Sequence, residues 1–235
     1  MYCIEYGKEN KDVIFLLHGG GLSWWNYKEV SMYLAKQFHV VLPILDGHAK
    51  SEHNFTTIEM NANRIIDYIN THFGGSIKLL GGVSLGAQIA LEILSKQKDI
   101  CSYALIESAL VLPSKMTSAL VEPAFGSSYG LISQRWFAKL QFSYLKIKED
   151  LFEDYYRDTC AISRDNMIAF LKENSMYKIK ETLKFTNAKM YIYVGEKENK
   201  KMLESAKLIH HTVIGSTLKV LENLYHGEFS INHAQ

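Results

Sequence analysis

A serine bracketed by glycines, between a strand-like run and a helical pattern, constrains this chain more than any other feature. Residues 76–81 are strand-like, and residues 85–96 repeat apolar side chains at helical spacing. Between them stands Gly82-Val83-Ser84-Leu85-Gly86, a G-x-S-x-G sequence. A serine on so sharp a turn needs neighbours without bulk, because the strand and the helix approach each other closely there. The stretch therefore predicts Ser84 above a sheet edge, with the Leu85 N–H free to bind an anion.

The same five residues have a plainer interpretation. Many glycine-rich turns join a strand to a helix, and their serine only caps the helix. The strand before this turn and the helix after it favour the nucleophile interpretation, because the motif requires that setting.

Length, charge and composition exclude several classes of protein. A chain of 235 residues suffices for one α/β domain with a modest insertion and is short for two independent domains. The 26 basic and 25 acidic residues nearly balance, so neither nucleic acid nor an anionic membrane is predicted as a partner. The amino terminus does not resemble a signal peptide, and no apolar run approaches the ~20 residues of a membrane span. We expect a cytoplasmic protein without membrane insertion.

Strand-like runs alternate with helical patterns along most of the chain. The expected strands are residues 2–6, 13–17, 39–42, 76–81, 103–106, 189–194 and 217–221, and the expected helices are residues 24–38, 56–73, 85–96 and 200–210. This alternation predicts an α/β fold with a mainly parallel, doubly wound sheet and helices on both faces. Ligands of such sheets bind beyond the carboxyl ends of the strands. The residues expected at that edge are 18–21, 46–51, Ser84 and Glu107.

The alternation stops between residues 113 and 184, which contain no strand-like run and many large apolar side chains at helical spacing. We expect a helical cap insertion there, over a core domain formed by residues 1–112 and 185–235. Packing of the cap helices against each other accounts for any one of these side chains. Together they indicate an apolar pocket.

A serine hydroxyl is a poor nucleophile unless a base accepts its proton and a carboxylate orients that base. The candidate bases after Ser84 are His210, His211, His226 and His233, and the candidate acids are Glu198, Glu196 and Glu107. The three cysteines include no C-x-x-C pair, so they are predicted to be reduced thiols, and no metal or cofactor is expected.

Several segments together resemble the α/β-hydrolase superfamily, in its small helical-cap branch. They are Phe15 to Gly21, Gly47 to Ser51, Gly82 to Gly86, Val194 to Glu198 and Tyr225-His226-Gly227. Their order, with serine first, then acid, then histidine, is the order of that family. The resemblance covers nearly the whole chain apart from the cap.

The resemblance implies a role for individual residues. Ser84 would be the nucleophile, His226 the base and Glu198 the acid, and the N–H groups of Gly20 and Leu85 would form the oxyanion hole. Two departures are visible. The family acid is most often Asp, so Glu196 and Glu107 remain alternatives, and Pro43 is followed by Ile44 where the family commonly has an aspartate.

The activity implied is that of a carboxylesterase-like serine hydrolase, which cleaves small or medium carboxylic esters or thioesters through an acyl-enzyme on Ser84. The expected partner is a small-molecule ester, and the expected assembly is a monomer or a homodimer. One alternative is a carbon–carbon bond hydrolase or lyase, with an arginine among Arg135, Arg157 and Arg164 binding a substrate carboxylate. Another is a ligand receptor that keeps the triad.

Overall fold

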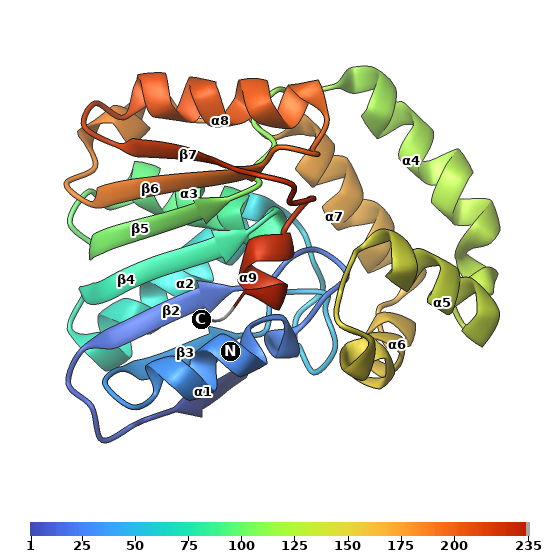
Figure 1. Cartoon of the computed structure of the whole chain (residues 1–235), viewed down its shortest axis with the longest axis horizontal. Coiled ribbons are helices and arrows are strands. Elements are labelled where there is room, and N and C mark those ends of the chain that lie inside the picture. The colour runs from blue at the N-terminus through green and yellow to red at the C-terminus, as the bar shows by residue number, and fades with distance from the viewer. Residues whose placement is uncertain (234–235) are drawn as a thin grey trace.

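The computed structural model describes residues 1–233, apart from the side chain of Ser127. Seven strands form one sheet in the order β1-β3-β2-β4-β5-β6-β7 (Figure 1). The strands are β1 (Cys3–Tyr6), β2 (Val13–Leu17), β3 (His39–Pro43), β4 (Ile77–Val83), β5 (Cys101–Glu107), β6 (Lys189–Gly195) and β7 (Thr217–Leu221). Strand β1 pairs with β3 in the antiparallel sense, and the other pairs are parallel. The predicted mainly parallel sheet is confirmed.

Helices cover both faces of the sheet. They are η1 (Trp24–Tyr27), α1 (Lys28–Leu34), α2 (Ile58–Phe73), α3 (Leu85–Lys96), α8 (Lys200–Thr212) and α9 (Glu228–Asn232). In Figure 1, α2 and α3 pack together behind the sheet, whereas α1 and α9 lie in front of it. The predicted helix over residues 24–38 is wrong in part, because a 3-10 turn precedes α1 and α1 ends at Leu34.

Strand β2 is apolar along its whole length because both faces of the sheet are covered there. In β2, Phe15 and Leu17 enter the hydrophobic cluster that includes residues of α2 and α3. Ile14 and Leu16 point the other way and join Tyr27 in a second cluster. Alternation of side chains along a strand therefore divides one apolar run between two cores.

Within the described residues, every element of regular structure between β5 and β6 is a helix. Its elements are α4 (Lys115–Ser128), η2 (Tyr129–Leu131), α5 (Arg135–Tyr144), η3 (Glu149–Leu151), α6 (Phe152–Cys160), α7 (Arg164–Met176) and η4 (Glu181–Phe185). In Figure 1, α4, α5 and α6 lie beyond the right-hand ends of the strands. Phe170 of α7 and Leu183 of η4 belong to the same hydrophobic cluster as the sheet. The later part of this segment thus packs with the core, and the division into core and cap remains a prediction.

The register of the sheet brings the carboxyl ends of its central strands level with each other. Leu17 lies opposite Gly82, and Val83 lies opposite Glu107. Gly195 at the end of β6 lies opposite Leu221 at the end of β7. The residues that follow these strand ends therefore emerge along one edge.

Candidate active site

Ser84 stands in a backbone conformation that non-glycine residues rarely adopt, with φ 54° and ψ −114°. Its neighbours must be glycine: a Cβ on Gly82 would lie 2.4 Å from the Gly86 carbonyl oxygen, and a Cβ on Gly86 would lie 2.1 Å from that of Leu17. The Ser84 N–H donates to the Glu107 carbonyl at 2.9 Å, which ties the turn to the end of β5. The half-buried serine is thus held by the sheet at the amino terminus of α3.

The amides of Gly20 and Leu85 lie close together at this edge. A Cβ on Gly20 would lie 3.5 Å from the Cβ of Leu85, the first residue of α3. The N–H groups on either side of Gly20 are engaged, since Gly19 donates to Asn26 Oδ1 at 3.2 Å and Gly21 donates to His48 Nε2 at 3.0 Å. Within the described residues, the Gly20 and Leu85 amides donate to no protein group. The loop therefore leaves two amides available for a ligand anion.

Two buried histidines brace this glycine loop. His18 places Nδ1 against the Gly19 carbonyl and accepts from the Leu45 amide through Nε2. The His48 ring stacks on Phe170 with 4.9 Å between ring centres. Burial lowers the pKa of His18 to about 3 and that of His48 to about 4, so both rings are neutral. With both ring nitrogens of each engaged, their role is structural.

Glu198 and His226 come from different loops and form a hydrogen-bonded pair. His226 Nδ1 lies 2.7 Å from Glu198 Oε2. Glu198 Oε1 accepts from Ser108 Oγ at 2.7 Å and from the Gly195 amide at 2.8 Å. Burial acts to raise the pKa of Glu198, but the His226 contact and these two donors outweigh it and hold that pKa below its ordinary value. A buried, ionised carboxylate therefore orients the exposed imidazole of His226.

The other two candidate acids have different partners. Glu196 Oε2 accepts from the Asn223 amide at 3.0 Å. Glu107 is buried and accepts from both the amide and the hydroxyl of Ser230 in α9. Burial raises the pKa of Glu107 to about 7. Of the three carboxylates, only Glu198 is hydrogen-bonded to a histidine among the described residues.

The His226 loop packs against the serine turn. A Cβ on Gly227 would lie 3.0 Å from Val83 Cγ2, and the Gly227 amide donates to Ser108 Oγ at 3.3 Å. Gly227, which follows His226, is therefore in contact with Val83, which precedes Ser84. Within the described residues, Ser84 Oγ forms no hydrogen bond to a protein group. The other candidate bases belong to other elements. His210 and His211 lie in the last turn of α8, and His233 follows α9.

Ser108 and Ser230 are part of this site although the sequence did not single them out. Ser108 follows β5 directly and, like Ser84, has a left-handed φ, of 53°. Its only sequence signal is its place after a strand end, which it shares with many residues. Ser230 lies in α9, where nothing in the sequence links it to Glu107.

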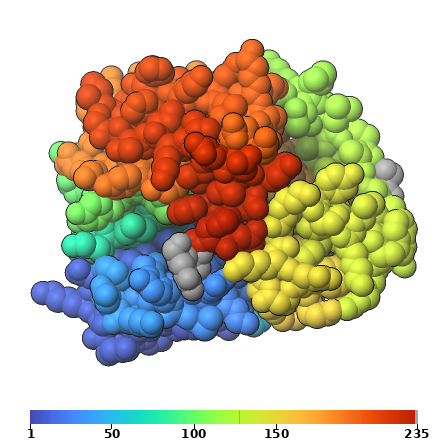
Figure 2. All heavy atoms as spheres, in the orientation of Figure 1, coloured from blue at the N-terminus to red at the C-terminus, as the bar shows by residue number. Residues whose placement is uncertain are grey.

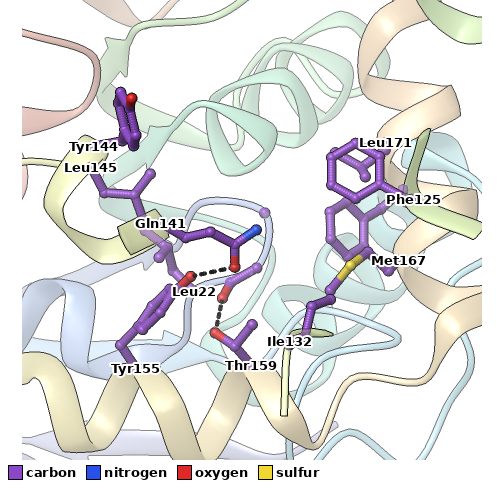
Figure 3. A pocket seen from close by; sticks show the side chains of 13 residues that line it. Leu22, Phe125, Ile132, Gln141, Tyr144, Leu145, Tyr155, Thr159, Met167 and Leu171 are labelled. Carbon is purple, nitrogen blue, oxygen red and sulfur yellow. Dashed lines mark hydrogen bonds between the residues drawn. The ribbon is translucent and has the colours of Figure 1, made fainter. Parts of the chain in front are cut away.

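Two cavities lie beside the candidate residues Gly20, Glu198 and His226. The first, of ≈ 340 Å³, runs from Gly20 and Gly21 between the helices that follow β5, and every side chain that lines it is uncharged (Figure 3). Its lining residues are Gly20, Gly21, Leu22, Phe125, Ile132, Gln141, Tyr144, Leu145, Tyr155, Thr159, Met167, Phe170 and Leu171. The second, of ≈ 400 Å³, is lined by His226, Glu198, Lys197 and Asn199, among others. Tyr144 and Leu145 line both.

The three arginines considered for binding a substrate carboxylate are engaged with acidic residues. Arg135 pairs with Glu153, Arg157 with Asp154 and Asp158, and Arg164 with Asp165. None of the three lines either cavity. Residues 1–233 contain no group of three His, Cys, Asp or Glu side chains placed to hold a metal ion. The same residues include no helix long and apolar enough to cross a membrane.

Comparison with solved structures shows the same fold in proteins of low sequence identity. A thermophilic esterase from Thermogutta terrifontis superposes with a TM-score of 0.77 at 17% identity, covering 98% of this chain and 87% of that one. The enol-lactonase from Burkholderia xenovorans LB400 gives 0.81 at 12% identity, covering 97% and 90%. MenH from S. aureus gives 0.76 at 17% identity, covering 98% and 92%.

Sequence comparison adds one curated relative and a family. A probable alcohol acetyltransferase from Cyberlindnera fabianii is 33% identical over 98 residues, which are 40% of this chain. The match spans only 26% of that relative's length. The model of the alpha/beta hydrolase family matches residues 14–224, nearly the whole chain. With a sheet, a serine turn and a strand order that agree with that match, this protein belongs to the alpha/beta hydrolase family.

Proposed function

We propose that this protein is a serine hydrolase that cleaves neutral carboxylic esters or thioesters of small or medium size through an acyl-enzyme on Ser84. One observation carries the proposal: the hydrogen-bonded pair of Glu198 and His226 lies at the sheet edge where Ser84 is held in a strained turn. Family membership supports a hydrolase in general.

In the proposed mechanism, His226 Nε2 accepts the proton of Ser84 Oγ as that oxygen attacks the ester carbonyl. Glu198 holds the Nδ1–H and stabilises the imidazolium that forms. The amides of Gly20 and Leu85 donate to the oxyanion. His226 then returns the proton to the leaving oxygen, and water cleaves the acyl-enzyme by the same steps.

The two cavities support a proposal for where each part of the ester binds. The carbonyl oxygen must face Gly20, which lines the uncharged cavity, so the acyl group extends into that cavity. The leaving oxygen must face His226, which lines the second cavity beside Lys197 and Asn199. An apolar acyl group with a more polar alcohol fits this arrangement. An acidic acyl group does not, because no cation lines the first cavity.

The test is turnover of p-nitrophenyl esters of graded chain length, together with fluorophosphonate labelling of Ser84. Ser84→Ala should abolish both, and Glu198→Gln should lower kcat by about 10³-fold or more. Glu196→Gln is the matched control on the same loop and should stay within about twofold. Absence of labelling in the folded wild-type protein would reject the proposal. Slow turnover with ligand-dependent protection of α4–α7 from hydrogen exchange would favour the receptor alternative.

A second candidate is transfer of the acyl group to an alcohol instead of water. The partial match to a probable alcohol acetyltransferase motivates it, and the cavity beside His226 offers room for an acceptor alcohol. Adding increasing amounts of a short alcohol to the esterase assay distinguishes the two. A transferase yields the new ester in proportion to the alcohol, whereas a strict hydrolase yields only the free acid.

A further inference from the structure

Three of the polar side chains that line the uncharged cavity stand in one row. Thr159 Oγ1 donates to the Gly21 carbonyl at 3.1 Å. Tyr155 lies one turn earlier on α6, and its hydroxyl contacts the Thr159 side chain. The same hydroxyl lies 3.5 Å from Gln141 Oε1 on α5. Figure 3 shows this row, which leads from the glycine loop to Gln141.

The two members of the row on α6 are held firmly in place. Tyr155 and Thr159 are both buried. The Tyr155 ring packs against Trp25 and Phe142, with 6.4 Å and 5.2 Å between ring centres. Burial raises the pKa of Tyr155 to about 12, so the hydroxyl keeps its proton and acts as a donor. A fixed donor therefore faces the oxygen of the Gln141 amide.

Gln141 presents the open end of this row to the cavity. With its oxygen towards Tyr155, its nitrogen Nε2 faces the side of the cavity where Phe125 and Met167 lie (Figure 3). Among the described residues, this nitrogen donates to no protein group, whereas the oxygen of the same amide has Tyr155 as its partner. The N–H groups of Gln141 are therefore available to a ligand that fills the cavity.

The rest of the lining offers little to a polar group of a ligand. Phe125, Met167 and Leu171 on the opposite side are apolar. Tyr144 is 78% exposed, and its hydroxyl points away from the row in Figure 3. A saturated chain in this cavity would displace water from the Gln141 N–H groups and offer no acceptor in return, which costs free energy. A few polar groups in an otherwise apolar pocket are what gives such a pocket its selectivity.

The row also relates Gln141 to the proposed reaction. Its first contact is with Gly21, next to the Gly20 amide proposed to bind the oxyanion. Thr159 and Tyr155 lie between that loop and Gln141, so the amide nitrogen meets an acyl group at a point remote from the scissile carbonyl. In Figure 2, α5 and α6 appear in yellow beside the red carboxyl-terminal segment that follows β7. The polar row thus lies on the same side of the molecule as the candidate base.

We infer that Gln141 selects acyl groups that carry a neutral hydrogen-bond acceptor, such as an ether or keto oxygen, part-way along an otherwise apolar chain. The inference rests on the proposed acyl-enzyme reaction at Ser84 and narrows its substrate class. Tyr155 is a positioning residue, because it acts on the ligand only through the Gln141 amide. A carboxylate is not selected, since no cation lines the cavity.

The experiment compares p-nitrophenyl heptanoate with its oxa analogues, in which an ether oxygen replaces one methylene group at successive positions. For one analogue, the ratio of its kcat/KM to that of heptanoate should be about fivefold or more lower in Gln141→Met than in wild type. This variant keeps the side-chain length and removes the donor. Comparing ratios between proteins cancels the inherent reactivity of each ester. Tyr155→Phe should lower the same ratio by less. Gln134→Met is the matched control, because Gln134 is exposed at the start of α5 and lines neither cavity.

A second measurement needs no turnover. Calorimetric titration of Ser84→Ala and Ser84→Ala/Gln141→Met with 2-octanone and its oxa analogues should show the same dependence in the ratio of Kd values. Ratios that are equal with and without Gln141 would overturn the inference, and so would an equal drop in Gln134→Met. If fluorophosphonate does not label Ser84 while the Kd ratio depends on Gln141, the proposed reaction fails and the subsite stands. If Ser84 is labelled and neither ratio depends on Gln141, only the subsite fails.

Discussion

The hydroxyl of Ser108 donates a 2.7 Å hydrogen bond to Glu198 and accepts a 3.3 Å hydrogen bond from the amide of Gly227. One buried side chain thereby joins the candidate acid to the loop that bears the candidate base. Ser108 achieves this in a left-handed conformation, φ 53°, with its own amide bonded to the Tyr193 carbonyl. The pairing of Glu198 with His226 therefore rests on a third residue, which lines neither of the two cavities beside the candidate site.

Removing this hydroxyl should loosen the pair without altering the cavities. Ser108→Ala should lower kcat about tenfold and leave KM nearly unchanged, because a hydrogen bond to a charged group contributes about 1.5–3 kcal/mol. Ser108→Gly lacks the same hydroxyl but tolerates the positive φ, so it should show the same kcat and a higher free energy of unfolding than Ser108→Ala. Steady-state kinetics and urea unfolding measure both quantities. Wild-type kcat in both variants would show that Ser108 positions nothing.

The strain at Ser84 should be visible as stability gained when activity is lost. Its φ of 54° favours glycine, and such conformations cost on the order of 1–3 kcal/mol for other residues. Ser84→Gly and Ser84→Ala should both be inactive, and the glycine variant should have the higher free energy of unfolding, by about 1 kcal/mol. Urea unfolding of the two variants side by side makes the comparison. If the alanine variant is as stable as the glycine variant, the backbone at Ser84 is not strained.

Glu107 should make stability fall as the pH rises. Burial raises its pKa from 4.5 to about 7 in the folded chain. Its favourable contribution is therefore complete below pH 4.5 and is lost as the pH rises through about 7. Glu107→Gln stays neutral at every pH, so its stability relative to wild type should increase by about 3 kcal/mol across this window. The measurement is urea unfolding at pH 5 and pH 8. A difference that does not change with pH would contradict it.

His48 should act in the opposite direction, by reducing stability in acid. Its pKa is lowered by burial from 6.5 to about 4, so below pH 6.5 the unfolded chain binds a proton that the folded chain does not. Stability is therefore lost as the pH falls from 6.5 towards 4. In His48→Gln, the free energy of unfolding lost between pH 6.5 and pH 5 should be smaller than in wild type by about 2 kcal/mol. The variant also loses the stacking on Phe170, but it does so at every pH. Thermal unfolding across that pH range measures the slope, and an unchanged slope would contradict the assignment.

The strands were predictable because their physical signal is local. Val13 to Leu17 is apolar throughout, as a strand covered on both faces must be, and the structure gives β2 those same bounds. Thr57, expected at the start of a helix, accepts from the Met60 amide and caps α2. The helix over residues 24–38 was predicted less well: residues 24–27 form a 3-10 turn, in which Trp25 donates to Asp158, more than a hundred residues later.

The choice of acid could not be made from the sequence. Glu107 ends β5, whereas Glu196 and Glu198 follow β6, and only the packing of the loops decides which of the three carboxylates contacts His226. For the same reason, the sequence does not show which aromatic side chains between β5 and β6 are buried and which are exposed. Phe142 and Phe152 pack on each other, with 5.3 Å between ring centres, whereas Trp136 faces solvent. A helix with apolar residues on both faces does not reveal which face is covered.

Helix α9 gives this arrangement a mechanical consequence. Ser230 is bonded to Glu107 of the sheet, Asn232 bonds to the backbone of Lys146 and Lys148, and Ile231 packs among residues of α5 and α6. Because Lys146 and Lys148 closely follow α5, a displacement of α5 would strain the Asn232 contacts or move α9 and the loop before it, which carries His226. The five-residue helix α9 therefore couples the position of the segment after α5 to that of the His226 loop.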